Sequence, residues 1–243
     1  MKEVRFFYDP EMNGILPEDE AKHAVRVLRL TIGDEIHLMD GKGTFYQAQI
    51  TSASNHKCCY QVLDVMPQQP DWVGHLHLAM APTKLNDRVE WFAEKATEIG
   101  FDELSFLDCQ FSERKIIKTE RIDKILVSAM KQSHKSKKPM LNEICSFRKF
   151  VESERKGDKF ICHCYEQDDV KHGTKKHHLF DVMQSGVPTT VLVGPEGDFS
   201  VEEVRLAMHN GYQCVTLGRS RLRTETAALV AVHLMQIKNQ IKD

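Results

Sequence analysis

The amino-acid sequence predicts an α/β protein with a small β-rich part at its N-terminus and a larger part in which strands and helices alternate. In roughly the first seventy residues, short β-branched and aromatic runs are joined by turn residues. The segment 67–71 (PQQPD) that follows has the composition of a linker. Beyond it, strand-like runs alternate with helical patterns, which implies a mostly parallel sheet with helices on both faces. We therefore expect two domains, 1–69 and 73–243.

The N-terminal domain is expected to be a small barrel or curled sheet with one helix. The strand patterns occupy 5–8 (RFFY), 35–40 (EIHLMD), 44–50 (TFYQAQI) and 58–66 (CCYQVLDVM). A helix pattern covers 17–30, with Pro17 in the first turn, where its missing N–H costs nothing. The apolar face of this helix holds Ala21, Ala24, Val25 and Leu28. Lys22, Arg26 and Arg29 are spaced i, i+4 and i+7, so they are predicted to form a basic stripe beside that face.

The C-terminal domain is expected to consist of alternating strands and helices. The strand patterns are 75–82 (HLHLAMAP), 103–107 (ELSFL), 159–164 (KFICHC), 189–194 (TTVLVG) and 212–218 (YQCVTLG). The helix patterns are 86–99, which Gly100 ends, 119–133, one that stops at His209, and 224–240. The last helix is apolar enough to form a dimer face, with packing into the protein's own core as the competing interpretation. The residues concerned are Leu229, Val230, Val232, Leu234 and Met235.

The composition is that of an ordinary globular protein. Hydrophobic residues make up 41% and charged residues 28% of the 243 residues, and the formal net charge is −2. No apolar run approaches the roughly 20 residues needed to cross a bilayer, and the N-terminus lacks an apolar signal-peptide core. We therefore expect a cytoplasmic protein without a membrane partner. The charge is uneven, because 113–138 holds nine Lys/Arg against three acidic residues. This segment is either a phosphate-binding surface or a helix with a solvated polar face.

The cysteines do not point to a disulfide framework or to a metal site. They number seven, without regular spacing, which is typical of reduced thiols. Within Cys162-His163-Cys164 the two cysteines would share one face of a strand, and the histidine would lie on the other. Three histidines lie close in sequence in an expected solvated loop, namely His172, His177 and His178. Since no second ligand pair at zinc-finger spacing exists, we expect no metal.

Two strand-to-helix turns have the composition of a ligand site. Residues 194–197 (GPEG) follow a strand, and Ser200 with Glu203 forms a capping box that starts the next helix. Residues 217–227 (LGRSRLRTETA) follow the next strand in the same way. Ligands of parallel sheets bind beyond the carboxyl ends of the strands, and glycine allows close approach of the backbone. Neither turn matches a known phosphate motif. Either backbone groups bind a ligand such as a purine ring, or these are ordinary connections.

The two turns also carry a resemblance. GPEGDFS with LGRSRLRTETA resembles the paired signature of the SPOUT-class RNA methyltransferases of the RsmE type, which methylate N3 of a uridine in 16S ribosomal RNA. The likeness covers nearly the whole chain. RFFY, HAVRVLR and GDEIHLMDGKGTFYQAQI are similar to the family's PUA-like RNA-binding domain, and KLNDRVEWFAEKATEIG and AMKQSHKSKKP to its middle motifs. Asp198 stands where the family has a third glycine, and Lys135 where it has arginine.

The resemblance implies a C-terminal SPOUT methyltransferase domain threaded into a trefoil knot, with a PUA-like β-barrel before it. It also implies a homodimer, and S-adenosylmethionine bound in a bent form by the loops of the knot, where the two turns fall. The cofactor-binding residues so implied are Gly194, Pro195, Glu196, Gly197, Leu217, Gly218, Leu222 and Thr226. Glu196 is either a clamp between loops or a polar contact to the methionine end of the cofactor.

Methylation at N3 of uracil requires removal of the N3 proton and stabilisation of charge on the uracil oxygens. A sulfonium methyl donor needs no metal. Arg223 is assigned to orient the base or hold its developing oxyanion, and Glu225 to accept the proton. Glu225 could instead only complement the positive end of the last helix. Thr224 and Thr226 are expected to act first as helix caps and second as ligand contacts.

The RNA substrate, 16S ribosomal RNA within the small subunit, requires a basic surface that contacts phosphates. The residues expected to contact it are Arg5, Lys22, Arg26, Arg29, Ser112, Arg114 and Lys135. Ser112 and Arg114 match a family motif. Two other functions remain open, a non-catalytic ribosome-assembly factor of the same fold and a methyltransferase of the same class that acts on transfer RNA or on a ribose. The intact GPEG and LRTETA motifs argue against the first.

Overall fold

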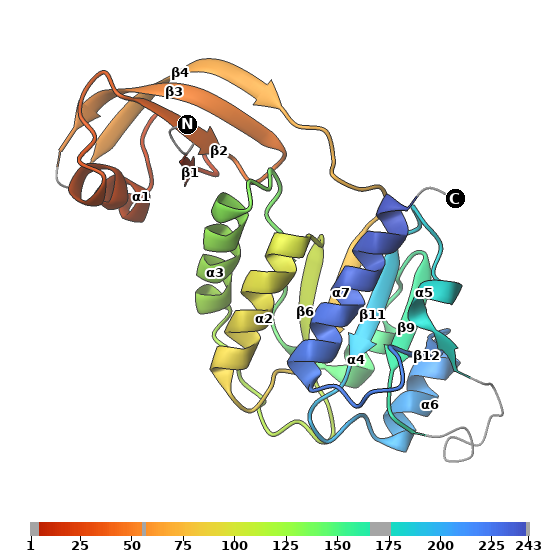
Figure 1. Cartoon of the computed structure of the whole chain (residues 1–243). Helices are drawn as coiled ribbons and strands as arrows, with labels where there is room; N and C mark the ends of the chain where they lie inside the picture. Colours follow the sequence, from red (N-terminus) through yellow and green to blue (C-terminus); the bar gives the residue numbers. More distant parts are fainter. Residues whose placement is uncertain (1–4, 55–56, 166–175, 242–243) are drawn as a thin grey trace. The chain divides into compact units, whose positions relative to one another are not determined.

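The computed structural model describes residues 5–54, 57–165 and 176–241, and the chain divides into two compact units (Figure 1). The N-terminal unit comprises Met1–Asp71 and Val127–Lys138. The C-terminal unit comprises Trp72–Leu126 and Pro139–Asp243. The second segment of the N-terminal unit lies far from the first in sequence, and nothing in the sequence pattern predicts that it belongs there.

The N-terminal unit is built on a four-stranded sheet in the order β1-β2-β3-β4. Its strands are β1 (Phe6–Tyr8), β2 (Glu35–Met39), β3 (Thr44–Ala53) and β4 (Cys58–Pro67), which confirms the four predicted strands. β1 pairs parallel with β2, and the other neighbours are antiparallel. Phe7, Leu38 and Ile50 of the sheet are buried in one cluster with Ala21 and Ala24. Two register shifts interrupt the ladder between β3 and β4, and such irregularities bend a sheet.

The first helix differs from the prediction. α1 (Glu18–Lys22) is α-helical, but the next five residues, η1 (His23–Val27), form a π-helix. The N–H of Leu28 accordingly donates to the carbonyl of His23, five residues back, at 3.0 Å. Arg29 then takes a left-handed φ of 57° and lies beyond the helix. A π-helical turn spans more residues than an α-helical one, and Arg29 lies outside the helix. The prediction that Lys22, Arg26 and Arg29 form a basic stripe on one α-helix is therefore wrong.

Within the described residues, the C-terminal unit contains an eight-stranded sheet in the order β10-β12-β9-β11-β5-β6-β7, with β8 paired to β6. All its ladders are parallel, which confirms the predicted parallel sheet. The strands are β5 (Leu76–Met80), β6 (Glu103–Asp108), β7 (Met140–Leu141), β8 (Cys145–Ser146), β9 (Asp158–Cys162), β10 (His177–His178), β11 (Thr189–Val193) and β12 (Gln213–Thr216). The three two-residue strands escaped prediction because so short a segment has no periodicity.

Helices cover both faces of this sheet, as the alternating pattern predicts. They are α2 (Asn86–Ile99), the first part of α3 (Thr119–Gln132), α4 (Phe147–Glu152), α5 (Leu179–Val182), α6 (Val201–His209) and α7 (Thr224–Gln240). Residues 119–126 of α3 belong to this unit, and residues 127–132 belong to the N-terminal unit. α7 packs against α2, β5 and β11, and α4 packs against α6; Figure 1 shows α2 and α7 in front of the strands and α4 behind them. Short α4 and α5 were not predicted. None of the helices in the described part of the chain is long and apolar enough to span a membrane.

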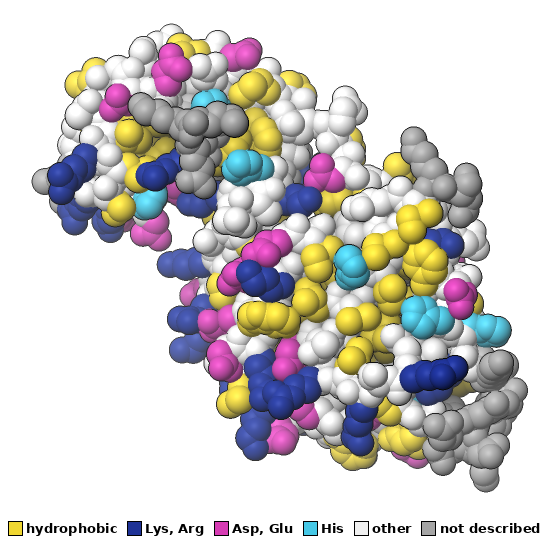
Figure 2. Space-filling model, viewed as in Figure 1, with side chains coloured by type: hydrophobic (Ala, Val, Ile, Leu, Met, Phe, Trp, Pro, Cys, Tyr) yellow, Lys and Arg dark blue, Asp and Glu magenta, His cyan; other side chains and the backbone are white. Residues whose placement is uncertain are grey.

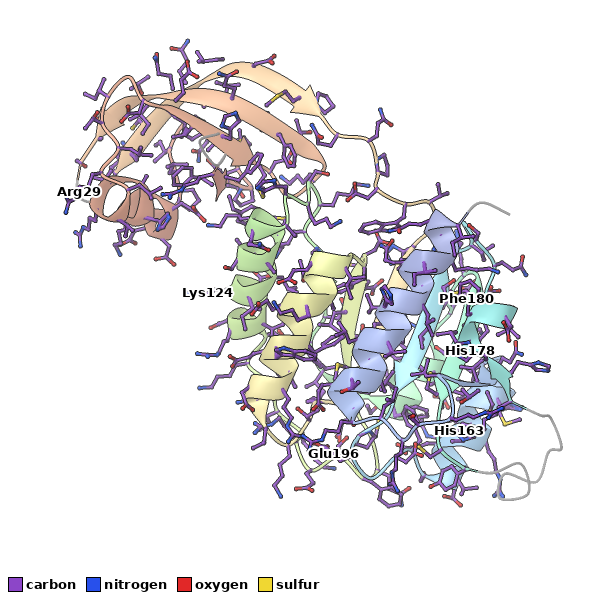
Figure 3. All side chains as sticks on the ribbon, viewed as in Figure 1. Arg29, Lys124, His163, His178, Phe180 and Glu196 are labelled. Atoms are coloured by element: carbon purple, nitrogen blue, oxygen red, sulfur yellow. The ribbon has the colours of Figure 1, made fainter. Side chains whose placement is uncertain are left out.

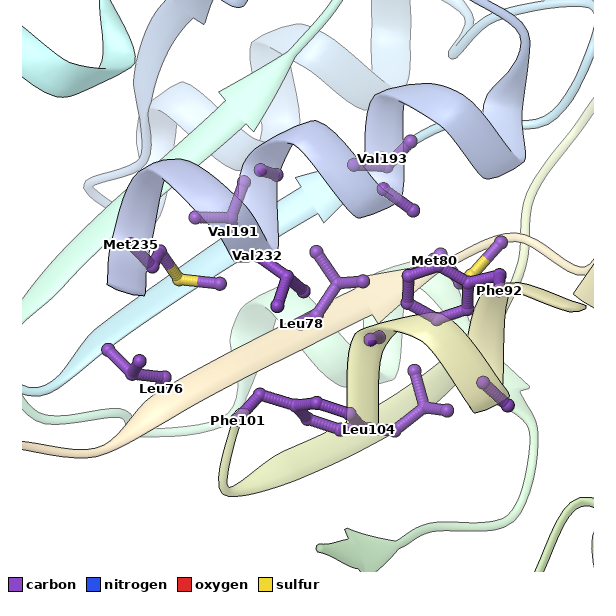
Figure 4. Packing of buried hydrophobic residues seen from close by; sticks show 14 of the residues in the cluster. Leu76, Leu78, Met80, Phe92, Phe101, Leu104, Val191, Val193, Val232 and Met235 are labelled. Carbon is purple, nitrogen blue, oxygen red and sulfur yellow. The ribbon is translucent and has the colours of Figure 1, made fainter. Parts of the chain in front are cut away.

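The alternation of side chains along the central strands separates two hydrophobic cores. On β5, Leu76 and Leu78 join a cluster with Phe92 of α2 and Val232 of α7 (Figure 4). Ala79, the residue after Leu78, joins the second cluster, which α4 and α6 cover. The sheet is therefore buried on both faces, and the place left for a ligand is the end where the strands stop.

The sequence leaves open whether the apolar residues of α7 form a dimer face or pack into the protein's own core, and the structure divides them between the two. Val232 and Met235 are fully buried in the core of the unit. Leu229 and Leu234 pack against that core but stay partly exposed, and Val230 is also partly exposed. The core interpretation is therefore correct for two of these residues, and a partly exposed apolar face remains on the helix.

Candidate functional site

The two glycine-rich turns lie at the same edge of the sheet but not on neighbouring strands. The 194–197 turn follows β11 and the 217–222 turn follows β12, while β9 lies between these two strands and pairs with both. Adjacent strands are about 4.8 Å apart, so the carboxyl end of β9 separates the turns by roughly two strand spacings. A ligand that touches both turns must cross the end of β9.

The turn after β11 is held by its neighbours in sequence. The Ser200 hydroxyl accepts from the N–H of Glu203 at 3.2 Å, and the Glu203 carboxylate accepts from the N–H of Ser200 at 2.8 Å. This confirms the predicted capping box at the start of α6. Gly194 and Pro195 are buried, and a Cβ on Gly194 would lie 3.1 Å from the Phe199 ring and backbone. A side chain at Gly194 would therefore require Phe199 to shift by a few tenths of an ångström, so packing within the protein disfavours one here.

Gly218, in the turn after β12, has a different environment. Its φ is 131°, a conformation that side chains rarely adopt, and a Cβ there would meet no heavy atom within 4 Å. The Thr216 hydroxyl accepts from the N–H of Gly218 at 3.2 Å and donates to its carbonyl at 2.9 Å. The turn is thus fixed from within and exposed on its outer side. An exposed glycine backbone with open space beside it fits a ligand that approaches the main chain closely.

Glu196 ties the 194–197 turn to the loop after β5. Its Oε1 accepts a hydrogen bond from the backbone N–H of Lys84 at 2.9 Å, across 112 residues of sequence. The Arg114 guanidinium holds the same loop, because it donates to the carbonyls of Thr83 at 3.1 Å and Lys84 at 2.6 Å. Loops that follow β5, β6 and β11 are therefore joined by side chains bonded to backbone. These contacts support the clamp interpretation of Glu196.

Asp198, the departure from the family's glycine, has a structural explanation. Its φ is 65°, in the left-handed region that glycine favours and that aspartate tolerates better than most residues. Its carboxylate accepts from the N–H of Cys164 at 2.8 Å, just beyond β9, and from the N–H of Phe199 at 2.8 Å. Asp198 therefore preserves the turn and joins it to the end of β9.

Arg223 and Glu225 lie at the start of α7 in contrasting environments. Arg223 is the exposed N-cap residue, and no side-chain cap bond forms at this end. Glu225 is 7% exposed, and its Oε1 lies 3.5 Å from Nη1 of Arg88, on the first turn of α2. Its other oxygen, Oε2, is buried without a hydrogen-bond partner in the described part of the molecule. The expectation that Thr224 and Thr226 cap the helix is wrong, because both already lie inside it and Arg223 is the N-cap residue.

Two polar residues at this end of the sheet could not be identified from the sequence. Arg88 lies in the quoted KLNDRVEW motif, but its partner Glu225 is 137 positions away. His163 follows β9 directly, and both its ring nitrogens are buried without a partner among the described residues. Burial lowers the pKa of His163 to about 4. The nearby Lys176 ammonium adds to this shift, and the Asp198 carboxylate opposes it. Figure 3 shows His163 and Glu196 at the same end of the C-terminal unit.

The predicted RNA-contacting residues divide between the two units. Arg5, Arg26 and Arg29 are exposed in the N-terminal unit. In the same unit, Lys22 pairs with Glu18 at 2.6 Å and Lys135 lies 3.4 Å from Asp71. Ser112 and Arg114 belong to the C-terminal unit.

Ser112 and several cations of the basic segment 113–138 make hydrogen bonds or ion pairs within the protein, which the sequence did not indicate. Ser112 is buried, and its hydroxyl accepts from the N–H of Cys109 at 3.1 Å, so its visible role is to close a turn. Arg121 of α3 pairs with Glu90 of α2, with Nη2 2.7 Å from Oε2, and Lys131 pairs with Glu20. In Figure 2, Lys and Arg side chains gather at the end of the C-terminal unit where α2 and α7 begin.

The described residues offer no metal-binding cluster. No group of three or more His, Cys, Asp or Glu side chains in these ranges could hold a metal ion. Of the three histidines noted in the sequence, His177 and His178 form β10 rather than a loop, and His172 lies outside the described residues. All seven cysteines are free thiols, and burial raises the pKa of Cys162 to about 12.

Comparison with known proteins identifies the family. Residues 70–236 match the family model described as an RNA methyltransferase domain. Residues 16–63 match the model described as an RNA methyltransferase PUA domain. The chain therefore belongs to the RNA methyltransferase family, as the resemblance of its two turns indicated.

Individual relatives agree over nearly the full length. A probable rRNA-methyltransferase from Porphyromonas gingivalis has a solved structure that is 38% identical, with a TM-score of 0.90 over 98% of this chain and 99% of that one. The structure of ribosomal RNA small subunit methyltransferase E from Neisseria gonorrhoeae bound to S-adenosyl methionine is 27% identical, with a TM-score of 0.80 over 97% and 98%. The Bacillus subtilis ribosomal RNA small subunit methyltransferase E is 26% identical over 92% of this chain and 89% of its own length.

Proposed function

We propose that this protein transfers the methyl group of S-adenosylmethionine to N3 of a specific uridine in 16S ribosomal RNA of the small subunit. The observation that carries the proposal is the combination of groups at one edge of the parallel sheet. Two glycine-rich turns, an exposed arginine and a buried, half-partnered carboxylate all follow the carboxyl ends of strands. The relatives named above support the substrate class and the cofactor.

We propose that the two turns hold the cofactor. Gly218 offers open space beside its backbone, and the 194–197 turn is fixed against the loop after β5 by Glu196. Both are features of a preformed site that binds through main-chain groups. The residues proposed to hold it are Gly194, Pro195, Glu196, Gly197, Leu217, Gly218, Leu222 and Thr226. S-adenosylmethionine bound there supplies an electrophilic methyl group, so the chain need only prepare the base.

Arg223 is proposed to hold a uracil oxygen. Its side chain is exposed at the N-terminus of α7, and the helix contributes a partial positive charge at the same end. A guanidinium presents parallel N–H groups to a carbonyl oxygen on which negative charge develops. Both contributions stabilise the deprotonated uracil more than the neutral base, which is the differential binding that catalysis requires.

Glu225 is proposed to accept the N3 proton at Oε2. The Arg88 guanidinium lies 3.5 Å from Oε1, whereas Oε2 has no hydrogen-bond partner among the described residues, so the two carboxylate oxygens are not equivalent. A buried carboxylate oxygen without a hydrogen-bond donor is costly unless a donor arrives. The N3–H group of uracil is such a donor. The alternative, in which Glu225 only complements the helix terminus, leaves Oε2 without a function.

The architecture proposed for the whole chain follows the same family. We propose a PUA-like β-barrel at 1–69 for RNA binding and a trefoil-knotted SPOUT domain at 73–243. The order β12-β9-β11-β5-β6, with the chain passing from β12 to a helix packed on β5, supports the knotted arrangement. The partly exposed apolar face of α7 supports a homodimer. Arg5, Lys22, Arg26, Arg29, Ser112, Arg114 and Lys135 are proposed to contact the RNA or to shape the surface that does.

The test is methyl transfer to a defined RNA. Purified protein is incubated with S-adenosylmethionine and either 16S RNA or small subunits from cells that lack the gene. Mass spectrometry of the nucleosides should show N3-methyluridine at one position. Methylation of transfer RNA or of a ribose in its place would overturn the proposal, as would RNA binding without cofactor binding, the behaviour of a non-catalytic assembly factor.

A further inference from the structure

An exposed aromatic side chain lies beside the proposed cofactor turn, in a position the mechanism does not use. Phe111 is 45% exposed and follows β6 by three residues. Among the phenylalanines and tryptophans in the described ranges, only Trp91 on α2, at 44%, is comparably exposed. A single exposed apolar residue is ordinary on a protein surface, so the surroundings of Phe111 decide whether it has a function.

The turn that carries Phe111 is held firmly on both sides of the residue. The Ser112 hydroxyl accepts from the N–H of Cys109 at 3.1 Å, and the Ser112 N–H donates to the Cys109 carbonyl at 3.1 Å. The N–H of Gln110 donates to Oε1 of Glu203 at 2.8 Å. Glu203 is itself part of the capping box of α6. The backbone of the turn is therefore attached to the same helix start that fixes the 194–197 turn.

Phe111 lies directly against that turn. A Cβ placed on Gly197 would be 3.0 Å from the Cβ of Phe111 and 3.7 Å from its Cγ. A side chain at Gly197 would therefore press against the base of the Phe111 side chain, which would have to shift by a few tenths of an ångström. Three residues further along the chain, the Arg114 guanidinium donates hydrogen bonds to the carbonyls of Thr83 and Lys84. The phenyl ring is thus fixed at its base, while nearly half of the residue is open to solvent.

This arrangement has the chemistry of a base-stacking platform. Unpaired RNA bases are held by stacking on aromatic side chains, beside cationic groups that follow the phosphates. A base that receives a methyl group must also leave its stack. We infer that Phe111 stacks on an unpaired base of the RNA substrate at the entrance to the site, an inference that rests on the proposed function. A rigid platform reduces the entropy lost when the base is captured.

The test compares substitutions at Phe111 with a matched substitution of the other exposed aromatic residue. RNA affinity is measured by fluorescence anisotropy with a labelled single-stranded uridine-rich RNA, over a series of salt concentrations. Phe111→Ala should weaken binding roughly 5- to 150-fold, the range expected when one base–aromatic stack is removed. The slope of log affinity against log salt should not change, because every contact to a phosphate is retained. Trp91→Ala should bind like the wild type.

Phe111→Leu separates stacking from packing against Gly197. Leucine keeps an apolar side chain over the glycine but has no aromatic face, so it should bind as weakly as the alanine variant, whereas Phe111→Tyr should retain affinity. Cofactor binding by calorimetry and the melting temperature should match the wild type in all three variants. Normal RNA affinity in Phe111→Ala, or full rescue by leucine, would overturn the inference. A wild type that methylates no ribosomal RNA would instead overturn the proposed function, and the two failures are distinguishable.

Discussion

The carboxylate of Glu196 accepts a hydrogen bond from the backbone N–H of Lys84 at 2.9 Å, and so joins the turn after β11 to the loop after β5. The donor is a neutral main-chain N–H, so an amide oxygen in the same place could also accept the bond, although a charged acceptor strengthens it. The Arg114 guanidinium donates to the carbonyls of the same loop, those of Thr83 and Lys84. A carboxylate between two glycines therefore has a structural reason to be there.

Glu196→Gln should leave cofactor affinity within a few-fold of the wild type, because an amide oxygen can accept the same hydrogen bond. Glu196→Ala removes the acceptor and frees the turn, so the affinity should fall about fivefold, which corresponds to roughly 1 kcal/mol for one hydrogen bond. Isothermal titration calorimetry with S-adenosylmethionine measures both. If the glutamine variant loses as much affinity as the alanine variant, the charge of Glu196 contacts the ligand and the clamp interpretation is wrong.

Gly218→Ala tests whether the cofactor approaches this backbone. The added methyl group meets no protein atom, but it would occupy the open space where the ligand is proposed to lie. A left-handed alanine costs about 1–2 kcal/mol of stability in any case. Gly33→Ala is the matched control, since Gly33 has a φ of 94° and equally open surroundings in the N-terminal unit. We expect similar melting temperatures and a loss of cofactor affinity in the Gly218 variant alone; equal affinities would refute this placement.

Arg223→Lys should fold and bind S-adenosylmethionine normally, because the side chain is exposed and makes no cap bond. Lysine keeps the charge but cannot reproduce the parallel N–H groups of a guanidinium. Removal of one oxyanion donor typically slows the chemical step about 10²- to 10³-fold. The measurement is single-turnover methyl transfer at saturating RNA. A normal rate with weakened RNA affinity would show that Arg223 is a backbone anchor.

Lys22, Arg26 and Arg29 lie on or just after the first helix of the N-terminal unit. A variant with all three replaced by Ala should bind RNA more weakly than the wild type. Removal of each cation that neutralises a phosphate should reduce the slope of log affinity against log salt by about one unit. Because Lys22 already pairs with Glu18, its contribution to this change in slope should be the smallest of the three. Lys57→Ala, an exposed cation of the same unit, serves as the control. An unchanged slope in the triple variant would exclude these residues from the RNA interface.

His77 should make the protein less stable in mild acid. It is 2% exposed, and its Nε2 lies 2.8 Å from the Ser105 hydroxyl. Burial lowers the pKa of His77 to about 3; the nearby Glu103 carboxylate opposes this shift, and the Arg155 guanidinium adds to it. The unfolded chain therefore takes up a proton below about pH 6.5, while the folded protein does not. The contribution of His77 to the free energy of unfolding is therefore fully present above about pH 6.5. As the pH falls from there toward about pH 3, the free energy of unfolding should decrease by no more than about 1.4 kcal/mol per pH unit for this one proton.

Urea unfolding between about pH 7 and pH 4 measures this contribution. His77→Gln removes the titrating group, so its stability should depend less steeply on pH than that of the wild type over this range. His75 also titrates, but its hydrogen bond with Glu103 raises its pKa, so its contribution has the opposite sign and is common to both proteins. Parallel pH profiles for the two proteins would show that His77 does not titrate in the unfolding equilibrium.

The sequence by itself determined the elements whose hydrogen bonds and side-chain spacing are local. The capping box of Ser200 and Glu203, the end of α2 at Gly100 and the strands β5 and β11 follow from the sequence, because each depends on residues a few positions apart. The pairing of two turn motifs was enough to identify the family. The π-helical turn after α1 has no such local signature, and the helix was therefore predicted too regular.

The tertiary structure alone decided which of these residues meet. The contact of Arg88 with Glu225 and the bond of Glu196 with Lys84 each join positions more than a hundred residues apart. β9 lies between β11 and β12 although it precedes both in the chain, and it thereby separates the two turns. Local periodicity reports which face of an element is buried, but strand order and long-range partners depend on how the elements pack, and a single sequence carries no periodic signal for either.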